Sequence, residues 1–403
     1  MFNVVLEIFL LIVFAFCTLS VAYFFVFSLA AALSRKKKNV KYSQPVNRIA
    51  VLVPAYKEDN IILFTAESLL KLNYPQELYD VYIIADSFDP FTIFQLKQLS
   101  LNVLEVSFKN STKTKALNKA FEAIKKQYDI ALICDADNIL AKDFLKYIDH
   151  EFKNGAKAVQ GRRVAKNLDT EFAMLDAFSE AINNHIFRKG ADALGLSSPV
   201  VGSGMAFEFN MAKNILSQIS AIGGFDKALQ LDITDSGIKI RYLENALIFD
   251  EKIDNPHAFK QQKKRWLLSQ FTYLKKFFVP GFKQVFKGNF SYFNLAVLNN
   301  IVLPRIFLIF GLLLLTLISY FVQPITIFIL FASITVLYFI TLFIAIPKDL
   351  KNRKMLPALL QLPKAVFLML LSLFAIKKAK KVFIHTVHTK NEVSNPLYNL
   401  NDN

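Results

Sequence analysis

The chain has 403 residues, of which 54% are apolar and 40 are phenylalanine, and its 48 Lys and Arg against 32 Asp and Glu give a formal net charge of +16. This composition excludes an intrinsically disordered chain, which requires low hydrophobicity, and 12 glycines with 13 prolines exclude a collagen-like one. Cys17 and Cys134 are too few for a disulfide framework, so we interpret both as buried thiols in a reducing compartment.

The first element that the sequence predicts is a membrane-spanning helix at residues 1–34. Glu7 is its only charged side chain, and about 20 apolar residues are enough to cross a bilayer as a helix. A cleaved signal peptide is the alternative, with Ala30–Ala32 before the cleavage site, but that class of peptide has a basic start and a shorter apolar core. The basic linker at residues 35–46 marks the cytoplasmic flank of a spanning helix, so we expect the N-terminus on the outer side.

Residues 47–255 have the pattern of a soluble α/β domain. Short apolar runs, which predict strands, alternate with segments of helical spacing. Strands and helices that alternate in this way form a parallel sheet covered by helices on both faces. The predicted strands are Ile49–Val53, Val81–Ala85, Val103–Phe108 and Ile130–Cys134, and the predicted helices are Glu58–Leu72 and Ala116–Ile124.

Acidic residues follow three of the four predicted strands. Glu58 follows the first strand, Asp86 the second, and Asp135 and Asp137 the fourth. A single acid at such a position is usually a turn residue or a helix cap, but the carboxyl ends of parallel strands share one rim, where ligands bind. Two carboxylates two residues apart can hold Mg²⁺ or Mn²⁺, and such an ion neutralises a departing diphosphate. We therefore expect a divalent metal at this rim.

Residues 256–294 contain the sequence Gln-Lys-Lys-Arg-Trp, which ends at the only tryptophan, Trp266. Arg265 can pair with a phosphate through its planar guanidinium, and an indole ring suits stacking on a sugar. The alternative is a basic amphipathic helix on the membrane surface, with Trp266 as its interfacial anchor. We expect interfacial helices in this segment under either interpretation.

Two further spanning helices are expected within residues 295–346, at the uncharged runs Ile306–Val322 and Ile325–Ile346. A basic loop and an apolar run of 12 residues, Ala365–Ile376, follow in residues 347–382. A run of about 10–14 residues is more often interfacial than spanning. A fourth span, the alternative, would place the lysines after this run outside, against the charge rule. The basic charge beside these segments indicates anionic lipid, and not nucleic acid, as the partner.

Two more motifs connect these elements to a known family. Val53–Glu58 is similar to that family's opening strand and loop, and Lys113–Asn118 to its Lys-x-x-Ala-Leu-Asn helix start. With D-x-D at Asp135–Asp137 and Q-x-x-R-W at Gln262–Trp266, the sequence resembles the membrane-bound inverting glycosyltransferases of family 2 over roughly residues 47–390. This group contains cellulose, chitin and hyaluronan synthases. The resemblance implies a GT-A-like nucleotide-binding sheet, a nucleotide sugar such as a UDP-sugar as donor, and Mg²⁺ or Mn²⁺ as cofactor.

The resemblance also implies roles for individual residues. The residues that it assigns to the nucleotide sugar are Glu58, Asp86, Lys115, Asp135, Asp137 and Arg265, with Asp137 as the metal ligand. The residues that it assigns to the acceptor are Gln262, Trp266 and Gly204. Gly204 belongs to a small-residue loop, Gly202–Met205, for which an ordinary turn is the alternative.

The general base is implied less directly, because the Glu-Asp pair of the family has no counterpart at the expected place. The best match is Phe225-Asp226, whose distance along the chain from Gln262 is close to the separation in the family. Asp226 is therefore the expected catalytic base, and Asp235 and Asp232 are the alternatives.

Residues 383–403 begin with a segment similar to the gating loop of the synthases, F-x-V-T-x-K. Phe383 and Thr386 match this pattern, while His388 stands in place of its Lys. The positive charge at that position would therefore depend on pH. A zinc pair formed by His385 and His388 is the alternative, but no convincing third ligand is near in the sequence.

The sequence thus predicts a glycosyltransferase of the cell (inner or plasma) membrane, with a cytoplasmic catalytic domain, that extends a glycan with inversion. Three spans are few for an export channel, so a homodimer or an export partner would complete it. Single-sugar transfer to a lipid phosphate carrier is one alternative. An inactive scaffold is another, because Phe225 stands where the family has Glu. A transporter is disfavoured, because the spans carry almost no charge.

Overall fold

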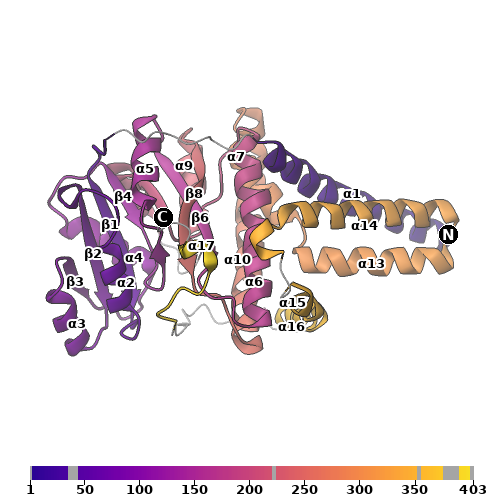
Figure 1. Cartoon of the computed structure of the whole chain (residues 1–403). Coiled ribbons are helices and arrows are strands. Elements are labelled where there is room, and N and C mark those ends of the chain that lie inside the picture. The colour runs from indigo at the N-terminus through magenta and orange to yellow at the C-terminus, as the bar shows by residue number, and fades with distance from the viewer. Residues whose placement is uncertain (1, 35–43, 220–223, 352–354, 375–389, 400–403) are drawn as a thin grey trace.

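The computed structural model describes residues 2–34, 44–219, 224–351, 355–374 and 390–399. An α/β domain lies at one end of the molecule, and long helices extend away from it, with the N-terminus at their far tip (Figure 1). Two further helices, α6 (Glu171–Asn183) and α10 (Pro256–Phe286), stand between these two parts. The soluble and the apolar segments of the sequence therefore occupy separate regions of the molecule.

Within the described residues, the α/β domain contains one sheet of eight strands in the order β3-β2-β1-β4-β7-β6-β8-β5. The strands are β1 (Ile49–Tyr56), β2 (Tyr79–Asp86), β3 (Asn102–Val106), β4 (Ile130–Ile133), β5 (Ile139–Leu140), β6 (Ala158–Ala165), β7 (Met205–Glu208) and β8 (Ile240–Asp250). The β1 strand pairs in parallel with β2 and β4, β2 with β3, and β6 with β8. The β7 strand is antiparallel to β4 and β6, and β5 to β8.

The predicted α/β fold is confirmed, and the four predicted strands, β1 to β4, pair in parallel. The β5 and β7 strands, which the sequence did not predict, run antiparallel to their neighbours. Only residues 134–138 separate β4 from β5, whereas a parallel connection needs a crossover of about a dozen residues or more. The β5 strand is therefore a short antiparallel edge on β8, and it holds the end of the D-x-D loop against that strand.

Helices cover both faces of the sheet, because successive side chains of a strand point to opposite sides. The helices on the faces are α2 (Ile62–Leu69), α3 (Pro90–Lys97), α4 (Lys113–Ala123), α5 (Phe144–Lys153), α8 (Phe209–Gln218) and α9 (Phe225–Asp235). Val51 and Val53 of β1 pack with α2, α3 and α5 on one face. Ala50 and Leu52 pack with α4, α8 and α9 on the other. The sheet is thus buried on both sides, and its strand ends remain as the site for ligands.

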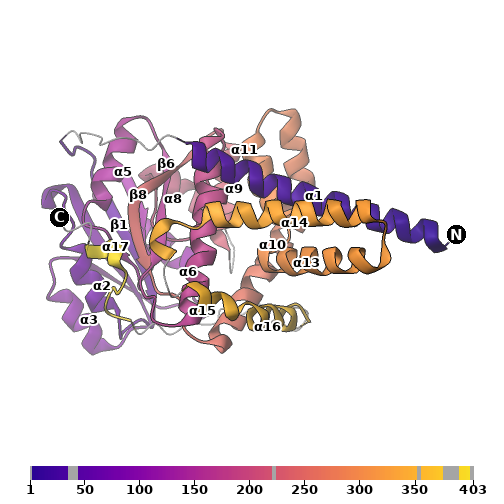
Figure 2. The ribbon, with the colours of Figure 1, turned by 45° about the vertical axis from the view of Figure 1, so that its right-hand side comes forward.

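Three helices of the described chain are long and apolar enough to cross a membrane, over Leu10–Leu33, Arg305–Val322 and Ile325–Ala345. They belong to α1 (Phe2–Leu33), α13 (Arg305–Val322) and α14 (Ile325–Ala345), which lie together in both views (Figures 1 and 2). The α13 and α14 helices begin and end within one residue of the predicted apolar runs. The α1 helix also packs closely on η2 (Asn184–Gly190), where a Cβ on Gly190 would lie 2.3 Å from the backbone oxygen of Phe27.

The apolar run after these helices forms α16 (Leu362–Phe374), which has 13 residues. Its Ala365 and Met369 pack in one cluster with Phe172 of α6 and Leu267 of α10. The interfacial position expected for this run stays a prediction. The other short elements are η1 (Gln76–Leu78), α7 (Ala191–Ala193), α11 (Phe290–Phe293), η3 (Asn294–Leu298), α12 (Asn299–Ile301), η4 (Lys348–Leu350), α15 (Met355–Leu360) and α17 (Pro396–Asn399).

Candidate active site

The carboxyl ends of β1 and β2 lie side by side and carry the first two predicted acids. Asp86, the last residue of β2, is 2% exposed, and its carboxylate accepts a hydrogen bond from the Ser87 hydroxyl at 2.9 Å. The Lys57 N–H, next to Glu58, donates to the Asp86 backbone oxygen at 3.1 Å. Lys57 and Ser87 have φ angles of 54° and 60°. Such angles are uncommon for residues other than glycine and concentrate at functional sites.

The D-x-D segment follows β4 on the same rim of the sheet. The Asp135 carboxylate accepts a charged hydrogen bond from Lys113 Nζ, at the start of α4. The Asp135 N–H donates to Ser203 Oγ at 2.9 Å, and Lys113 Nζ donates to the Gly202 backbone oxygen at 2.6 Å. Three segments that are far apart in the sequence thus meet at Asp135.

Gly204 has a backbone role that the sequence alone does not reveal. Its φ is +58°, and a Cβ at this position would lie 1.8 Å from Cδ1 of Ile248 on β8. A side chain there would force Ile248 to shift and would strain the backbone, so glycine suits the close approach of the loop to β8. The Gln160 side chain secures the loop by donating to the Ser203 backbone oxygen at 3.0 Å. Contact between Gly204 and an acceptor stays a prediction.

Asp137 is buried more deeply than Asp135 and is held at two points. Its backbone oxygen accepts a hydrogen bond from Lys166 Nζ at 3.0 Å, and its Oδ2 accepts one from the Glu251 N–H at 3.4 Å. The Lys166 side chain is fully buried. Burial lowers the pKa of Lys166, and the charges of Asp137 and Glu251 act in the opposite direction. The carboxylate of the predicted metal ligand is therefore fixed before any ligand binds.

The two aspartates fit a metal that is completed by a substrate. In the described part of the chain there is no group of three or more His, Cys, Asp or Glu side chains that could hold an ion by itself. Mg²⁺ is usually held by one or two carboxylates together with substrate phosphates, and Mn²⁺ favours the same oxygen ligands. Asp135 and Asp137 supply such carboxylates, so the donor set suits an ion that binds with a diphosphate.

The structure brings Lys113, and not the predicted Lys115, to the D-x-D segment. Lys115 Nζ donates to the Asn110 backbone oxygen at 2.8 Å, on the exposed side of the helix start. Residues two positions apart on an α-helix point about 200° apart, so only one of the two lysines can face Asp135. Lys113 Nζ also lies 5.5 Å from the centre of the Phe225 ring, at the start of α9. Lys113 is thus the lysine that contacts the D-x-D segment, and the role of Lys115 at a phosphate stays a prediction.

Asp226 is the expected base that lies nearest to these charges. It occupies the first turn of α9, and burial raises its pKa, against the opposing charges of Lys227, Lys113 and Arg163. Asp235, one of the alternatives, is exposed and accepts a hydrogen bond from Gln284 of α10. Asp232 is also exposed. Lys113 and Arg163 thus influence Asp226, and its role as the base stays a prediction.

The Q-x-x-R-W segment lies in the first half of α10. The buried Oε1 of Gln262 has no hydrogen-bond partner among the described residues, and such an acceptor costs about 1–3 kcal/mol when it stays unpaired. Trp266 is 40% exposed, and Lys263 Nζ lies 3.9 Å from the centre of its ring. Lys263 also forms an ion pair with Asp176 of α6 at 2.8 Å. The indole is thus held by a cation–π contact that the motif itself does not predict.

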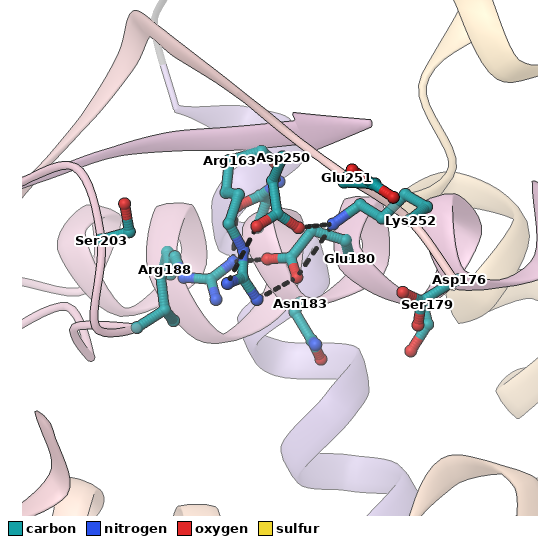
Figure 3. A network of polar contacts seen from close by, with 12 residues as sticks. Arg163, Asp176, Ser179, Glu180, Asn183, Arg188, Ser203, Asp250, Glu251 and Lys252 are labelled. Atoms are coloured by element: carbon teal, nitrogen blue, oxygen red, sulfur yellow. Dashed lines mark hydrogen bonds and ion pairs between the residues drawn. The ribbon is translucent and has the colours of Figure 1, made fainter. Parts of the chain in front are cut away.

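A network of buried charges lies behind the site, and sequence reasoning missed it (Figure 3). Glu180 of α6 pairs with Arg163 at 2.8 Å and with Arg188 at 2.7 Å. Asp250 pairs with Lys252 at 2.7 Å and with Arg163 at 3.7 Å. Burial alone would raise the pKa of Glu180, but Arg163, Arg188 and Lys252 hold it well below its usual value. The signal in the sequence would have been Glu180, an acidic residue in a helix whose neighbouring residues are largely apolar.

The network is connected to the D-x-D loop. Asn138, one residue after Asp137, donates from Nδ2 to Asp250 at 3.3 Å. Arg163 contributes positive charge toward Asp226. The predicted gating residues Phe383, Thr386 and His388 lie outside the described residues, so their prediction is unchanged.

These features define a mixed α/β domain with an acidic, cation-lined site at its strand ends and apolar helices attached. The family described as Glycosyltransferase like family 2 matches residues 45–269, more than half of the chain. The chain belongs to this family. The resemblance that the sequence motifs indicate is therefore confirmed at the level of the family.

Two curated relatives are similar over this region. One is the probable glycosyltransferase YdaM of Bacillus subtilis, 23% identical over 255 residues, which are 59% of this chain and 58% of that protein. Another is a beta-monoglucosyldiacylglycerol synthase of Nostoc sp., 26% identical over 244 residues, which are 57% of this chain and 50% of that protein. The chain thus spans about half the length of the curated relatives it matches.

One solved structure is similar over almost the whole chain. It is the mannosyltransferase PcManGT from Pyrobaculum calidifontis, in complex with GDP-Man and Mn²⁺. The match covers 90% of this chain and 97% of that chain, with a TM-score of 0.56 and 14% identity. At this identity the likeness concerns the fold, and it agrees with the predicted GT-A-like sheet.

Proposed function

We propose that the chain is a membrane-bound glycosyltransferase that transfers a sugar from a nucleotide sugar, such as a UDP-sugar, to an acceptor hydroxyl with inversion. The observation that carries this proposal is that Lys113 and the loop at Ser203 both contact Asp135, two residues before Asp137. The charge of Lys113 also acts on the pKa of Asp226. This arrangement offers carboxylates for a metal and a cation for a phosphate, with the half-buried carboxylate of Asp226 as the base.

Asp226 removes the proton in this mechanism. The acceptor oxygen attacks the anomeric carbon while its proton moves to the Asp226 carboxylate, and the bond from that carbon to the diphosphate oxygen breaks. Attack from the face opposite the leaving group inverts the configuration. A raised pKa suits this role, because a general base works best when its pKa lies near the working pH. Burial raises the pKa of Asp226 in that direction.

The leaving diphosphate gathers negative charge, and this chain offers cations for it. Lys113 and Arg265 are the proposed protein cations. Lys113 contacts Asp135, and Arg265 is the exposed arginine of the Q-x-x-R-W segment, whose guanidinium suits a phosphate. A Mg²⁺ or Mn²⁺ ion held by Asp137, with Asp135 beside it, would supply Lewis-acid stabilisation of the same charge. Glu58 and Asp86, on the neighbouring strand ends, are the proposed contacts to the nucleoside. The Mn²⁺ in the PcManGT complex supports this choice of ion.

Two acceptors are supported by different observations. A growing glycan is favoured by Q-x-x-R-W, where the exposed Trp266 ring offers a stacking face. A single transfer to a lipid is favoured by the beta-monoglucosyldiacylglycerol synthases among the relatives. Isolated membranes incubated with a panel of UDP- and GDP-sugars and Mn²⁺ would separate them by product size. A ladder of products supports polymer synthesis, one solvent-extractable glycolipid supports lipid transfer, and no transfer contradicts the proposal.

The proposed membrane topology has three spans, α1, α13 and α14, with interfacial helices at residues 256–294 and 347–382. The segment Lys390–Asn399 contacts the α/β domain, for example through a 2.7 Å hydrogen bond from Asn395 to the Ala165 backbone oxygen. Both parts therefore lie on the same side of a bilayer, which requires an even number of crossings between them. The α13 and α14 helices supply two, so a spanning α16 does not fit.

A test of this topology uses reporter tags. The basic linker at residues 35–46 favours the cytoplasm as the side of the catalytic domain, residues 47–255, at the inner or plasma membrane. Tags after residue 46 and at the C-terminus should both report the cytoplasm, and a tag at residue 1 the outer side. A C-terminal tag on the outer side would contradict the three-span topology.

A further inference from the structure

The chain returns to the catalytic domain after its membrane helices. The segment Lys390–Asn399, which ends in α17, lies against the edge of the sheet, and its yellow ribbon runs beside β6 and β8 in Figure 1. The Tyr398 ring meets the Phe249 ring edge to face, with 5.3 Å between the ring centres. Val393 and Leu397 join the same cluster, which includes Ile139 of β5. We call Lys390–Asn399 the docking segment.

Polar contacts fix the register of the docking segment on the end of β6. The Asn395 side chain is buried, and its Nδ2 donates to the Ala165 backbone oxygen at 2.7 Å. Its Oδ1 accepts from the Leu397 N–H at 3.0 Å. The Ser394 N–H donates to the Lys166 backbone oxygen at 2.9 Å. The Asn395 side chain thus makes one hydrogen bond to the sheet and one within the docking segment, and it lies at the centre of the contact between them.

Two chains of contacts run from the docking segment to Asp137. In one, the segment holds the Lys166 backbone, and Lys166 Nζ donates to the Asp137 backbone oxygen at 3.0 Å. In the other, the Lys390 N–H donates to Glu251 Oε2 at 3.0 Å, and the Glu251 N–H donates to Asp137 Oδ2 at 3.4 Å. Both the backbone and the carboxylate of Asp137 therefore contact residues that the docking segment holds.

We propose that the docking segment positions Asp137, so that the C-terminal end of the chain sets the affinity of the D-x-D site for a divalent cation and a nucleoside diphosphate. This inference rests on the proposed function. A metal ligand must be held in place to bind well, and partners that orient the ligands of a metal site typically contribute 10–100-fold in affinity. Asn395 and Tyr398 are thus positioning residues, although neither contacts the candidate site itself.

Lys390 supplies a matched control, because its two contacts can be separated. Its backbone N–H contacts Glu251, whereas its side chain pairs at the surface with Asp169 at 2.7 Å. Lys390→Gln removes the surface pair and keeps the backbone contact. Asn395→Ala and Tyr398→Ala loosen the segment itself, and Tyr398→Phe keeps the ring that packs on Phe249.

The test measures Mn²⁺ binding by electron paramagnetic resonance on the purified full chain, with UDP and with GDP. Asn395→Ala and Tyr398→Ala should weaken Mn²⁺ binding by about tenfold or more, while Lys390→Gln and Tyr398→Phe bind as the wild type does. Hydrogen exchange in the metal-free protein is the second measurement. The peptide 134–140 should exchange at least threefold faster in Asn395→Ala, and the peptide 49–56 should not change.

Each outcome decides the inference. Unchanged Mn²⁺ affinity in Asn395→Ala overturns it, even if sugar transfer falls. Unchanged hydrogen exchange of the peptide 134–140 in Asn395→Ala also overturns it, because the segment would then not hold the D-x-D loop in place. A wild type that binds Mn²⁺ with neither nucleotide overturns the proposed metal site and this inference together. A wild type that binds Mn²⁺ but transfers no sugar contradicts the proposed function alone.

Discussion

Lys113 and Asp135 form an ion pair that closes the candidate site from one side. The pair joins the start of α4 to the loop after β4, and Lys113 Nζ reaches the Gly202 backbone oxygen from the same position. Both side chains are partly exposed, so solvent and ligands reach them. A diphosphate with its metal would compete with Asp135 for this lysine. The ion pair is therefore a resting contact that donor binding would exchange for another.

The first prediction separates the two lysines of this helix start. Lys113→Ala should lower kcat/KM for the nucleotide sugar by about 10–100-fold, since a hydrogen bond to a charged group contributes about 1.5–3 kcal/mol. Lys115→Ala should stay within about threefold of the wild type, because Lys115 Nζ donates to the Asn110 backbone oxygen and not to the D-x-D segment. Initial rates against donor concentration test both. Equal losses in the two variants would contradict the assignment of Lys113.

The second prediction concerns the metal. Asp137→Ala should abolish turnover, because the departing diphosphate loses the ligand of its Lewis acid. The variant should still fold and insert, since Lys166 binds the Asp137 backbone oxygen, which the substitution keeps. Transfer assays with membranes, together with thermal unfolding of the purified variant, measure the two effects. Full activity of the wild type in EDTA would rule out a metal-dependent mechanism.

The local parts of this molecule were predictable. Strands β1 and β4 were predicted because a short run of apolar residues is a local signal, and the acids after them follow from the same pattern. The long apolar helices α1, α13 and α14 are equally local, since each follows from one apolar run. The family motifs then selected Asp226 as the expected base, and this assignment stays a prediction.

The long-range parts were not predictable from one sequence. The β7 strand is inserted between β4 and β6 although it follows both in the chain, and no local pattern encodes such pairing. Glu180 and Asp250 meet around Arg163 only after the sheet and α6 have assembled. The choice between Lys113 and Lys115 depends on where α4 begins, which a motif does not fix to one residue.

The third prediction concerns the stability of the buried charges. Glu180→Gln should lower the free energy of unfolding by about 3–5 kcal/mol, because Arg163 and Arg188 lose their buried partner. Glu105→Gln is the matched control. It removes an exposed pair with Lys97 of 2.6 Å, and such surface pairs contribute about 0–1 kcal/mol. Thermal unfolding in detergent at pH 7 measures the difference.

The pH dependence of this effect has a definite sign. The pKa of Glu180 is held well below its ordinary value of 4.5 in the folded protein. Its contribution to stability is therefore fully present above the unfolded pKa and is lost as the pH falls toward the folded pKa. The gap between the wild type and Glu180→Gln should be narrower at pH 4 than at pH 7. A gap that widens on acidification would contradict the role of the ionised carboxylate.

The fourth prediction concerns Asp226. A general base contributes typically about 10²–10⁴-fold to rate, so Asp226→Asn should lower transfer by that order. Its affinity for the nucleotide sugar should change little, because the base faces the acceptor in the proposed mechanism. Asp232→Asn and Asp235→Asn are the matched controls, since both side chains are exposed. Each should remain within about tenfold of the wild type, which is under roughly 1.4 kcal/mol.

The raised pKa of Asp226 adds a second measurement that a general loss of structure would not reproduce. Because burial raises this pKa in the folded protein, ionising Asp226 costs stability as the pH rises above the unfolded value. Asp226→Asn should therefore be at least as stable as the wild type at pH 7 while being nearly inactive. The wild-type rate should also fall on acidification at a higher pH than an ordinary carboxylate would give.

If Asp235→Asn is inactive and Asp226→Asn active, the base is Asp235. If all three variants remain active, the proton goes to another group and the proposed mechanism fails.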